Sequence, residues 1–466
     1  MTLPEAFIED IKAYLPPSEL VPFIQALTDS EPTTSLRYNR AKYAEQTGLP
    51  IGWNPADGVY VDERPNFTLD PLLHAGCYYV QEASSQFVTH VLRSLVKEPV
   101  TALDLCAAPG GKSTAMLSVL PEESQLVSNE IDRRRARILS ENITKWGYPN
   151  VSVTCNAPAD FRGLDHQFDL ILADVPCSGE GMFRKDQGAV DDWSPQKVKS
   201  CVALQREILD TIWPTLKAGG IMVYSTCTFN VHEDEEMLAY ICDELGAEAL
   251  DIPTETAWHI HPQLVGHRPC YRFMPHFTKG EGLFMAAVRK TGDNYEPKTS
   301  RKTDSKRKGS GKAFGKGEKS RPMIDLKKLA PTLLSQLDCE ASIELTSEGI
   351  VRAIPAAHKA LHDSLTSQGL YLLQSGIEMG TIKGRDIIPA HALALSIVHK
   401  GNAFPTVEVN LDTALNYLRH EAITLDAAAP TGYLIVTYRG HALGFVKNLG
   451  NRSNNLYPQE WRIRFV

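Results

Sequence analysis

The middle of the chain alternates short apolar runs with segments of helical periodicity. Between residues 100 and 290, the runs VTALDL, SQLVSNE, VSVT, FDLILAD, GIMVYST and LFMAAVRK have the length and composition of strands. Helical patterns begin at Lys112 and also cover residues 131–146, 196–216 and 233–245. This alternation predicts the α/β class, with a doubly wound, mostly parallel sheet and helices on both faces.

The two ends of the chain have patterns of their own. Helical periodicity predicts an α-rich N-terminal extension over residues 1–75, followed by the sheet domain over residues 76–290. Alternating apolar positions and closely spaced turns predict an α+β region over residues 323–466 that ends in a small β-rich unit. Residues 291–322 hold ten lysines or arginines and four acidic residues, which predicts a flexible linker. This linker is either a solubilising spacer or a basic strap for nucleic-acid phosphates.

Composition narrows the class of protein. The chain has 466 residues, 43% hydrophobic and 22% charged, as in ordinary globular proteins of several domains. Its nine cysteines form no C-x-x-C pair, which argues against a disulfide framework and a structural zinc site, so no metal is expected. With no apolar run of membrane length and no secretory signal, we expect a cytoplasmic protein without membrane contact. The net charge of −8 means that any contact with phosphates depends on local basic patches.

Polar side chains collect where the predicted strands end. Ligands of open α/β sheets bind outside the carboxyl ends of the strands. Asp104, Glu130 and Asp174 end three of these strands, and the thiols of Cys177 and Cys227 follow the later ones. A single buried cysteine is ordinarily a small hydrophobe, but carboxylates and two thiols converging on one edge predict a functional site.

The loop APGGKST limits the ligands that this edge can bind. A dinucleotide site needs G-x-G-x-x-G, which the loop lacks. A triphosphate loop is closer, but its first required glycine is Cys106, so a nucleoside triphosphatase is the weaker alternative. S-adenosylmethionine fits better, because Glu130 at the end of the second strand can accept hydrogen bonds from ribose hydroxyls. The alternative for such an acid, a helix cap, suits Asp132 better.

At these residues the chain resembles a known family. DLCAAPGGKST, DVPCSGEGMFRKD and YSTCT closely resemble the signatures of the nucleolar-protein/Sun family of RNA 5-methylcytosine methyltransferases, from about Tyr78 to Arg289. The resemblance implies a Rossmann-like class I methyltransferase fold with S-adenosylmethionine as cofactor. The ends of the chain are similar to a bacterial member that acts on 16S rRNA, with an RNA-binding N-terminal extension and a C-terminal PUA-like RNA-binding domain.

The resemblance also implies roles for single residues. Cys227 would be the nucleophile, Cys177 would assist release of the product, and Asp174 would meet both cofactor and target base. Asn156 stands where the family has an aspartate for the adenine amino group, with Asp160 as the alternative. The reverse assignment of the two cysteines, as in DNA cytosine methyltransferases, stays open from the residues alone. The implied cofactor-binding residues are Ala107, Ala108, Pro109, Gly110, Gly111, Lys112, Ser113, Glu130, Asn156 and Asp174.

Such chemistry explains the need for a thiol. Cytosine C5 is a poor nucleophile, so a group must first add at C6, and the pKa of an unperturbed thiol, about 8.5, requires activation for this attack. Charge that develops on the base must be compensated, which an acid such as Asp174 at the N3 edge can do. A base, Cys177 or a water, must then take the C5 proton.

The expected partner is 16S rRNA within the small ribosomal subunit, and not DNA. The protein itself is expected to be a monomer. The alternatives are an enzyme of the same fold acting on transfer RNA and a non-catalytic ribosome assembly factor. Intact thiols and an intact glycine loop argue against the latter. Basic residues among aromatics or near turns are expected to contact RNA, although each has an ordinary surface role as its alternative: Arg37, Arg40, Lys42, Lys185, Lys447, Arg452 and Arg462.

Overall fold

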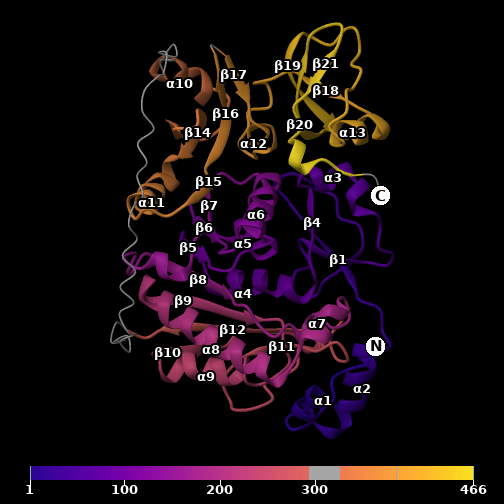
Figure 1. Cartoon of the computed structure of the whole chain (residues 1–466), viewed down its shortest axis with the longest axis vertical. Coiled ribbons are helices and arrows are strands. Elements are labelled where there is room, and N and C mark those ends of the chain that lie inside the picture. The colour runs from indigo at the N-terminus through magenta and orange to yellow at the C-terminus, as the bar shows by residue number, and fades with distance from the viewer. Residues whose placement is uncertain (1, 293–325, 385, 465–466) are drawn as a thin grey trace.

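A computed structural model describes residues 2–292, 326–384 and 386–464. Apart from its first two residues, the predicted linker over residues 291–322 lies outside the described residues. The centre of the molecule is a nine-stranded sheet in the order β10-β12-β9-β8-β5-β6-β7-β15, with β11 paired to β12 (Figure 1). No helix in the described ranges is long and apolar enough to cross a membrane.

The central sheet confirms the predicted mostly parallel arrangement. All six strands expected from the apolar runs are present, and three others, β10, β11 and β15, were not foreseen. The parallel strands are β5 (Thr101–Asp104), β6 (Gln125–Asn129), β7 (Val151–Thr154), β8 (Phe168–Asp174) and β9 (Leu216–Thr226). The antiparallel strands are β10 (Ala247–Leu250), β11 (Tyr271–Phe273), β12 (Leu283–Lys290) and β15 (Leu372–Ser375).

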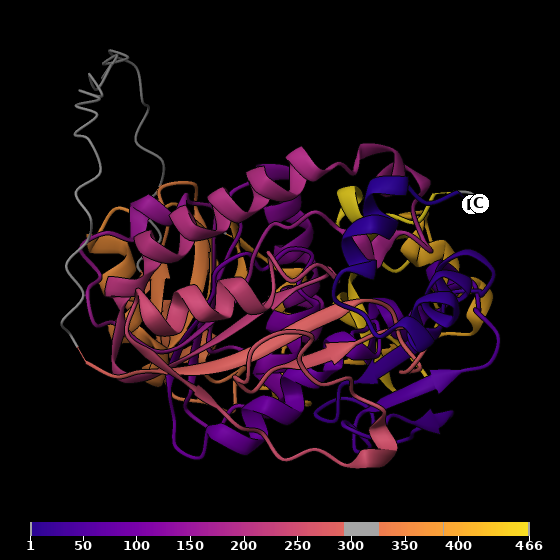
Figure 2. The ribbon, with the colours of Figure 1, turned by 90° about the horizontal axis from the view of Figure 1, so that it is seen from below.

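Helices cover both faces of this sheet, as Figure 2 shows from below. Leu126, Val151 and Leu170 point to one face, which α4, α5 and α6 cover. Val127 and Ile171 point to the other, which α8, α9 and α11 cover. The helices on the first face are α4 (Phe87–Leu95), α5 (Gly111–Val119) and α6 (Arg133–Trp146), and those on the second are α8 (Pro195–Ile212), α9 (Glu235–Asp243) and α11 (Ala356–Ser367).

The N-terminal extension contains a sheet as well as the expected helices. Its helices are α1 (Glu5–Lys12), α2 (Pro17–Thr28) and the short α3 (Pro71–His74). The strands form an antiparallel sheet in the order β2-β3-β1-β4: β1 (Thr34–Tyr38), β2 (Leu49–Pro50), β3 (Gly58–Val61) and β4 (Tyr78–Val80). Strands this short give almost no periodic signal, so the sequence pattern predicted only the helices.

The C-terminal region contains two four-stranded sheets and also completes the central one. The first has the order β13-β14-β16-β17, with β13 (Ala341–Leu345), β14 (Ile350–Pro355), β16 (Ile377–Lys383) and β17 (Asp386–Pro389). The second has β18 (Thr406–Glu408), β19 (Gly432–Tyr438), β20 (His441–Asn448) and β21 (Ser453–Asn455) in sequence order. Further helices of the chain are α7 (Gln187–Asp192), α10 (Leu326–Leu334), α12 (His391–Leu395) and α13 (Leu411–Leu418).

Candidate active site

The loop from β5 to α5 and the first turn of α5 contain seven of the predicted cofactor residues, Ala107 to Ser113. Gly110 precedes α5 with a φ of 114°, a conformation that side chains rarely adopt, and a Cβ there would lie 3.2 Å from a methyl carbon of Leu139. The Ser113 hydroxyl donates to Asp104 Oδ2 at 2.6 Å. This contact ties the start of the helix to the end of the strand and leaves the loop between them open to the cavity.

Asp104 is a site residue to which the sequence reasoning gave no role. Its side chain is fully buried, and burial raises its pKa to about 7. Among the described residues, its Oδ1 has no hydrogen-bond partner, and Asp104 lines the cavity at this edge. The available signal was its position as the last residue of the first parallel strand.

Asp132 is the helix cap that the sequence predicted, and the ribose contact expected of Glu130 stays a prediction. Asp132 caps α6, since its carboxylate accepts from the amides of Arg134 and Arg135, both at 2.9 Å. Glu130 is buried at the end of β6 and lies 3.3 Å from the Arg135 guanidinium, whose other nitrogen donates to the Ala108 carbonyl at 2.7 Å. Arg135 therefore links the acid to the cofactor loop.

The predicted adenine contact, Asn156, binds the backbone of Tyr371. Its Oδ1 accepts from the Tyr371 amide at 3.0 Å, and its Nδ2 donates to the Tyr371 carbonyl at 3.2 Å. Tyr371 directly precedes β15, the strand that the C-terminal region adds next to β7. The amide of Asn156 therefore joins two distant parts of the chain, and its contact with adenine stays a prediction. The alternative, Asp160, is exposed and accepts from the Ala157 amide at 2.9 Å.

Asp174 forms the centre of the polar contacts at the end of β8. Its Oδ2 lies 2.9 Å from Lys112 Nζ, and its Oδ1 accepts from the Ser225 hydroxyl at 2.7 Å. Burial lowers the pKa of Lys112, but Asp174 and then Cys227 outweigh this effect, so that the net direction is upward. Lys112 therefore stays charged beside Asp174. The sequence placed it in the cofactor loop and also made it a candidate for contact with a base or phosphate, with a solvated lysine as the alternative.

The two predicted thiols lie in contact. Sγ of Cys177, in the loop after β8, is 3.3 Å from Sγ of Cys227, which directly follows β9. The hydrogen bond with Cys227, reinforced by burial, raises the pKa of the Cys177 thiol well above its usual range. Cys177 accordingly holds its proton and can donate it toward the sulfur of Cys227.

These groups share one cavity of about 750 Å³. It is lined by Asp104, Lys112, Asp174, Cys177 and Cys227, together with residues 107–109 of the cofactor loop. The N-terminal sheet supplies another wall, through residues 33–35 and 79–82, and Lys185 also lines the cavity. Sequence reasoning did not foresee this contribution from the N-terminal extension.

Two of the basic residues expected to contact RNA in this extension have structural roles. Arg37 is fully buried: it donates to Gln81 Oε1 at 2.7 Å and to Thr114 Oγ1 at 2.6 Å, and burial lowers its pKa to about 10. The prediction that Arg37 contacts RNA is therefore wrong. Lys42 donates to the carbonyls of Ala75 at 3.0 Å and Lys145 at 2.6 Å, so its ammonium group also serves the fold.

The other predicted RNA contacts lie nearer the surface. Arg40 is exposed, although it donates to the Ala44 carbonyl at 2.7 Å. In the C-terminal region, Arg452 and Arg462 are exposed and lie outside the strands, while Lys447 of β20 is half-buried with its Nζ 4.9 Å from the centre of the Tyr433 ring.

Comparison with known families accounts for most of the chain. A family described as 16S rRNA methyltransferase RsmB/F matches residues 92–289. The N-terminal domain of 16S rRNA methyltransferase RsmF matches residues 3–83, and the methyltransferase RsmF PUA domain matches residues 404–463. The sheet of β18 to β21 thus belongs to a PUA domain, as the sequence resemblance implied.

Individual proteins are similar over most of the chain. Ribosomal RNA small subunit methyltransferase F of Vibrio cholerae is 27% identical over 99% of this chain and 98% of that protein. The protein of the same name in Cronobacter sakazakii is 27% identical, covering 98% and 96% of the two chains.

Solved structures share the fold. A crystal structure of PH0851 has a TM-score of 0.55 and 24% identity, covering 62% of this chain and 66% of that one. NSun6 from Pyrococcus horikoshii with SFG has a TM-score of 0.54 and 18% identity, covering 62% and 99%. The three matched regions follow one another along the chain, and the motif residues line one cavity. The chain belongs to the RsmB/F family of S-adenosylmethionine-dependent RNA 5-methylcytosine methyltransferases.

Proposed function

We propose that this protein forms 5-methylcytosine in 16S rRNA of the small ribosomal subunit, through a covalent bond between Cys227 and C6 of the target cytosine. One observation carries the proposal: the two thiols lie 3.3 Å apart in the same cavity as the ion pair of Lys112 with Asp174. A nucleophile, a second thiol, a carboxylate and a fixed cation are the groups that this reaction needs.

The cofactor side of the cavity fits S-adenosylmethionine. The ligand carries a cationic ammonium group and two ribose hydroxyls. Asp104 offers a buried carboxylate oxygen without a partner among the described residues, and Glu130 offers a second buried acid at the next strand end. The loop of Ala107 to Ser113 lies between them, with Gly110 allowing its turn. When bound, S-adenosylmethionine supplies the methyl group.

The attack on the base follows from the contacts of Cys227. Its thiolate adds to C6, and the electrons of the C5–C6 double bond become available at C5. The ammonium group of Lys112 favours the thiolate, and the protonated Cys177 can donate a hydrogen bond to it. Asp174, held by Lys112 and Ser225, compensates charge at the N3 edge by sharing a proton with the base.

Release of the product reverses the first step. After C5 has accepted the methyl group, a base removes the remaining C5 proton, the C5–C6 double bond re-forms, and the bond from C6 to Cys227 breaks. Cys177 supports this step because it touches the leaving sulfur. Its raised pKa means that it keeps its proton during attack. As the bond from C6 breaks, Cys177 can pass this proton to the departing sulfur of Cys227 and take the C5 proton in its place.

The choice of 16S rRNA rests on the chain as a whole. The relatives with matching ends are named as ribosomal RNA small subunit methyltransferases, and they cover nearly the full chain, PUA domain included. Transfer RNA is the competing substrate. We expect methyl incorporation into small subunits or 16S rRNA and little into transfer RNA; the opposite preference would overturn the substrate assignment while leaving the chemistry intact.

Covalent trapping tests the chemistry. RNA containing 5-fluorocytosine cannot lose the group at C5, so the covalent complex accumulates and migrates slowly on a denaturing gel. We expect this adduct with the unmodified protein and with Cys177→Ala, and none with Cys227→Ala. An adduct that persists in Cys227→Ala and vanishes in Cys177→Ala would reverse the two roles.

A further inference from the structure

The two catalytic cysteines lie on separate loops that must be held together. The first cysteine loop, residues 175–186, joins β8 to α7, and the second, residues 227–234, joins β9 to α9. A direct backbone hydrogen bond between them runs from the Gly181 amide to the Cys227 carbonyl at 2.8 Å. Side chains supply further contacts between the two loops.

Glu180 reaches from the first loop to the second. Its Oε2 accepts from the backbone amides of Phe229 at 2.7 Å and Asn230 at 3.0 Å, two and three residues beyond the catalytic Cys227. Its Oε1 accepts from the indole nitrogen of Trp193 at 2.9 Å and from the side chain of Asn230 at 2.8 Å. A carboxylate of the first loop thus binds the backbone of the second.

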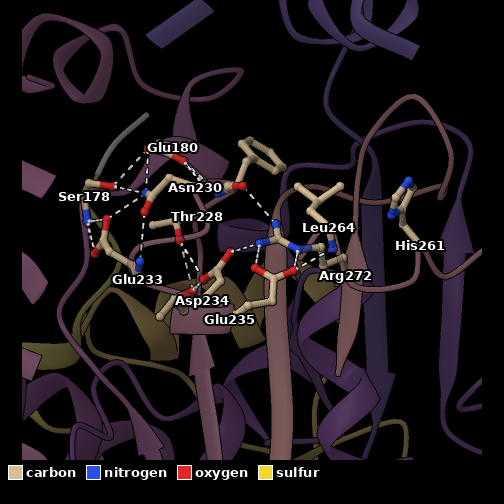
Figure 3. Close-up of polar contacts among 12 residues, drawn as sticks. Ser178, Glu180, Thr228, Asn230, Glu233, Asp234, Glu235, His261, Leu264 and Arg272 are labelled. Carbon is tan, nitrogen blue, oxygen red and sulfur yellow. Dashed lines mark hydrogen bonds and ion pairs between the residues drawn. The ribbon is translucent and has the colours of Figure 1, made fainter. Parts of the chain in front are cut away.

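Glu233 reaches in the opposite direction. Its Oε2 accepts from the backbone amide of Ser178, the residue after Cys177, at 3.0 Å. Gln205 donates to the same oxygen at 2.7 Å and to the carbonyl of Pro176 at 3.0 Å. The amide of Asn230 donates to Glu233 Oε1 at 2.9 Å and joins the two carboxylates (Figure 3).

This crossed pair is fully buried and lies outside the reaction cavity. Glu180 and Glu233 are both 0% exposed, and neither lines the cavity of the thiols. Burial and the nearby Glu233 raise the pKa of Glu180, so the hydrogen bonds must offset a cost that the fold would avoid with apolar residues. Such a cost needs a reason, and bonds to backbone amides beside both cysteines provide one.

Two further acids next to Glu233, Asp234 and Glu235, hold the second loop in place. Asp234 Oδ1 accepts from the hydroxyls of Thr226 at 2.6 Å and Thr228 at 2.9 Å, the residues on either side of Cys227. Arg272 lies 3.0 Å from Asp234 and also pairs with Glu235 (Figure 3). Its guanidinium group supplies a buried positive charge to both acids. The second loop is therefore fixed to β9 and β11, and Glu180 and Glu233 fix the first loop to it.

We infer that Glu180 and Glu233 are positioning residues whose crossed hydrogen bonds set the distance between the thiols of Cys177 and Cys227. The consequence of this inference rests on the proposed function. Without the crossed hydrogen bonds of Glu180 and Glu233, which we call the clasp, Cys227 still attacks the base. Cys177 then no longer meets the leaving sulfur, and the release step slows. Attack and release are coupled because each cysteine loop holds the backbone of the other.

The test measures thiol proximity without cofactor or RNA. Diamide oxidises two thiols in contact to a disulfide, and mass spectrometry of the Cys177–Cys227 pair gives its rate. Loss of one bond of the clasp shifts the sulfurs by a fraction of their separation, so we expect Glu180→Gln and Glu233→Gln to slow disulfide formation about tenfold. The matched control is Asp57→Asn, a buried carboxylate that pairs with Arg40 and Arg93 instead, and it keeps the original rate.

A kinetic measurement separates positioning from general damage. In the two glutamine variants we expect kcat to fall about tenfold, with the covalent complex accumulating on unfluorinated RNA. Because only release is slowed, KM for RNA falls with kcat, and kcat/KM stays within about twofold of the original. Folded variants with unchanged disulfide rates would overturn the inference. If both variants fail to fold, Asn230→Ala removes only the linking amide, and an unchanged disulfide rate there overturns it equally. Absence of any RNA adduct in the unmodified protein contradicts the proposed function and leaves the disulfide readout intact.

Discussion

The catalytic edge of the sheet has two halves that are built differently. At the ends of β5, β8 and β9, residues from three short motifs contact one another: Lys112 meets Asp174, and Cys177 meets Cys227. At the end of β7, the C-terminal region closes the edge. The backbone amide and carbonyl of Tyr371 there form hydrogen bonds with both polar atoms of the Asn156 side chain. The reacting half is local to the methyltransferase motifs, whereas the other half depends on a segment 215 residues away.

The largest expected effect is in the reacting half. Asp174→Asn keeps the shape of the side chain but removes the charge that holds Lys112 and that, in the proposed mechanism, compensates charge on the target base. We expect kcat to fall by a factor of about a hundred to a thousand, measured by transfer of a radiolabelled methyl group to RNA. Ser225→Ala, which removes only one hydrogen bond to Asp174, serves as the milder comparison. A kcat for Asp174→Asn within about threefold of the original would remove Asp174 from the chemistry.

In the other half we expect stability to respond, and cofactor binding much less. Asn156→Ala breaks two hydrogen bonds to Tyr371, which should lower the free energy of unfolding by about 1–3 kcal/mol. Cofactor affinity, measured by calorimetry, should change by less than about twofold, whereas Glu130→Ala should weaken it about tenfold. Loss of cofactor affinity in Asn156→Ala without loss of stability would support the adenine role that the sequence suggested.

The buried acid at the end of β5 predicts a pH dependence. Burial raises the pKa of Asp104 from 3.8 to about 7, so the folded protein binds a proton that the unfolded chain has lost in this range. Its contribution to the free energy of unfolding therefore falls as the pH rises from 3.8 towards 7.

The same ionisation should govern the cofactor. If the ionised Asp104 binds the cofactor ammonium group, cofactor affinity falls about tenfold per pH unit below pH 7, and Asp104→Asn abolishes this dependence. Calorimetry at a series of pH values measures it. A pH-independent affinity in the unmodified protein would contradict the role of Asp104.

The smallest expected effect is on RNA binding, and it comes from comparing the exposed Arg452 with the buried Arg37. Arg452→Ala removes an exposed charge of the PUA domain, and we expect the slope of log RNA affinity against log salt concentration to decrease by about one. Arg37→Ala breaks buried hydrogen bonds to Gln81 and Thr114, so it lowers the melting temperature and leaves that slope unchanged. Filter binding at several salt concentrations distinguishes them, and a changed slope in Arg37→Ala would revive its RNA contact.

Prediction from sequence succeeded for local patterns and for residues that the ends of neighbouring parallel strands bring together. The six strands, the helix cap at Asp132 and the contact of Cys177 with Cys227 follow from the alternating pattern and from the rule that parallel strands end at one edge. It failed for Arg37, because a basic residue among aromatics has the same local sequence whether it packs inside or faces RNA.

The sequence by itself determined the doubly wound sheet, the family and the set of groups at its catalytic edge, because strand periodicity and motif spacing are local properties. Only the tertiary structure decided how those groups are held. The pairing of β15 with β7, the N-terminal wall of the cavity and the crossed bonds of Glu180 and Glu233 join segments through backbone amides and carbonyls. Every residue other than proline carries the same backbone amide, so no pattern of side chains predicts which amides will form hydrogen bonds between distant segments.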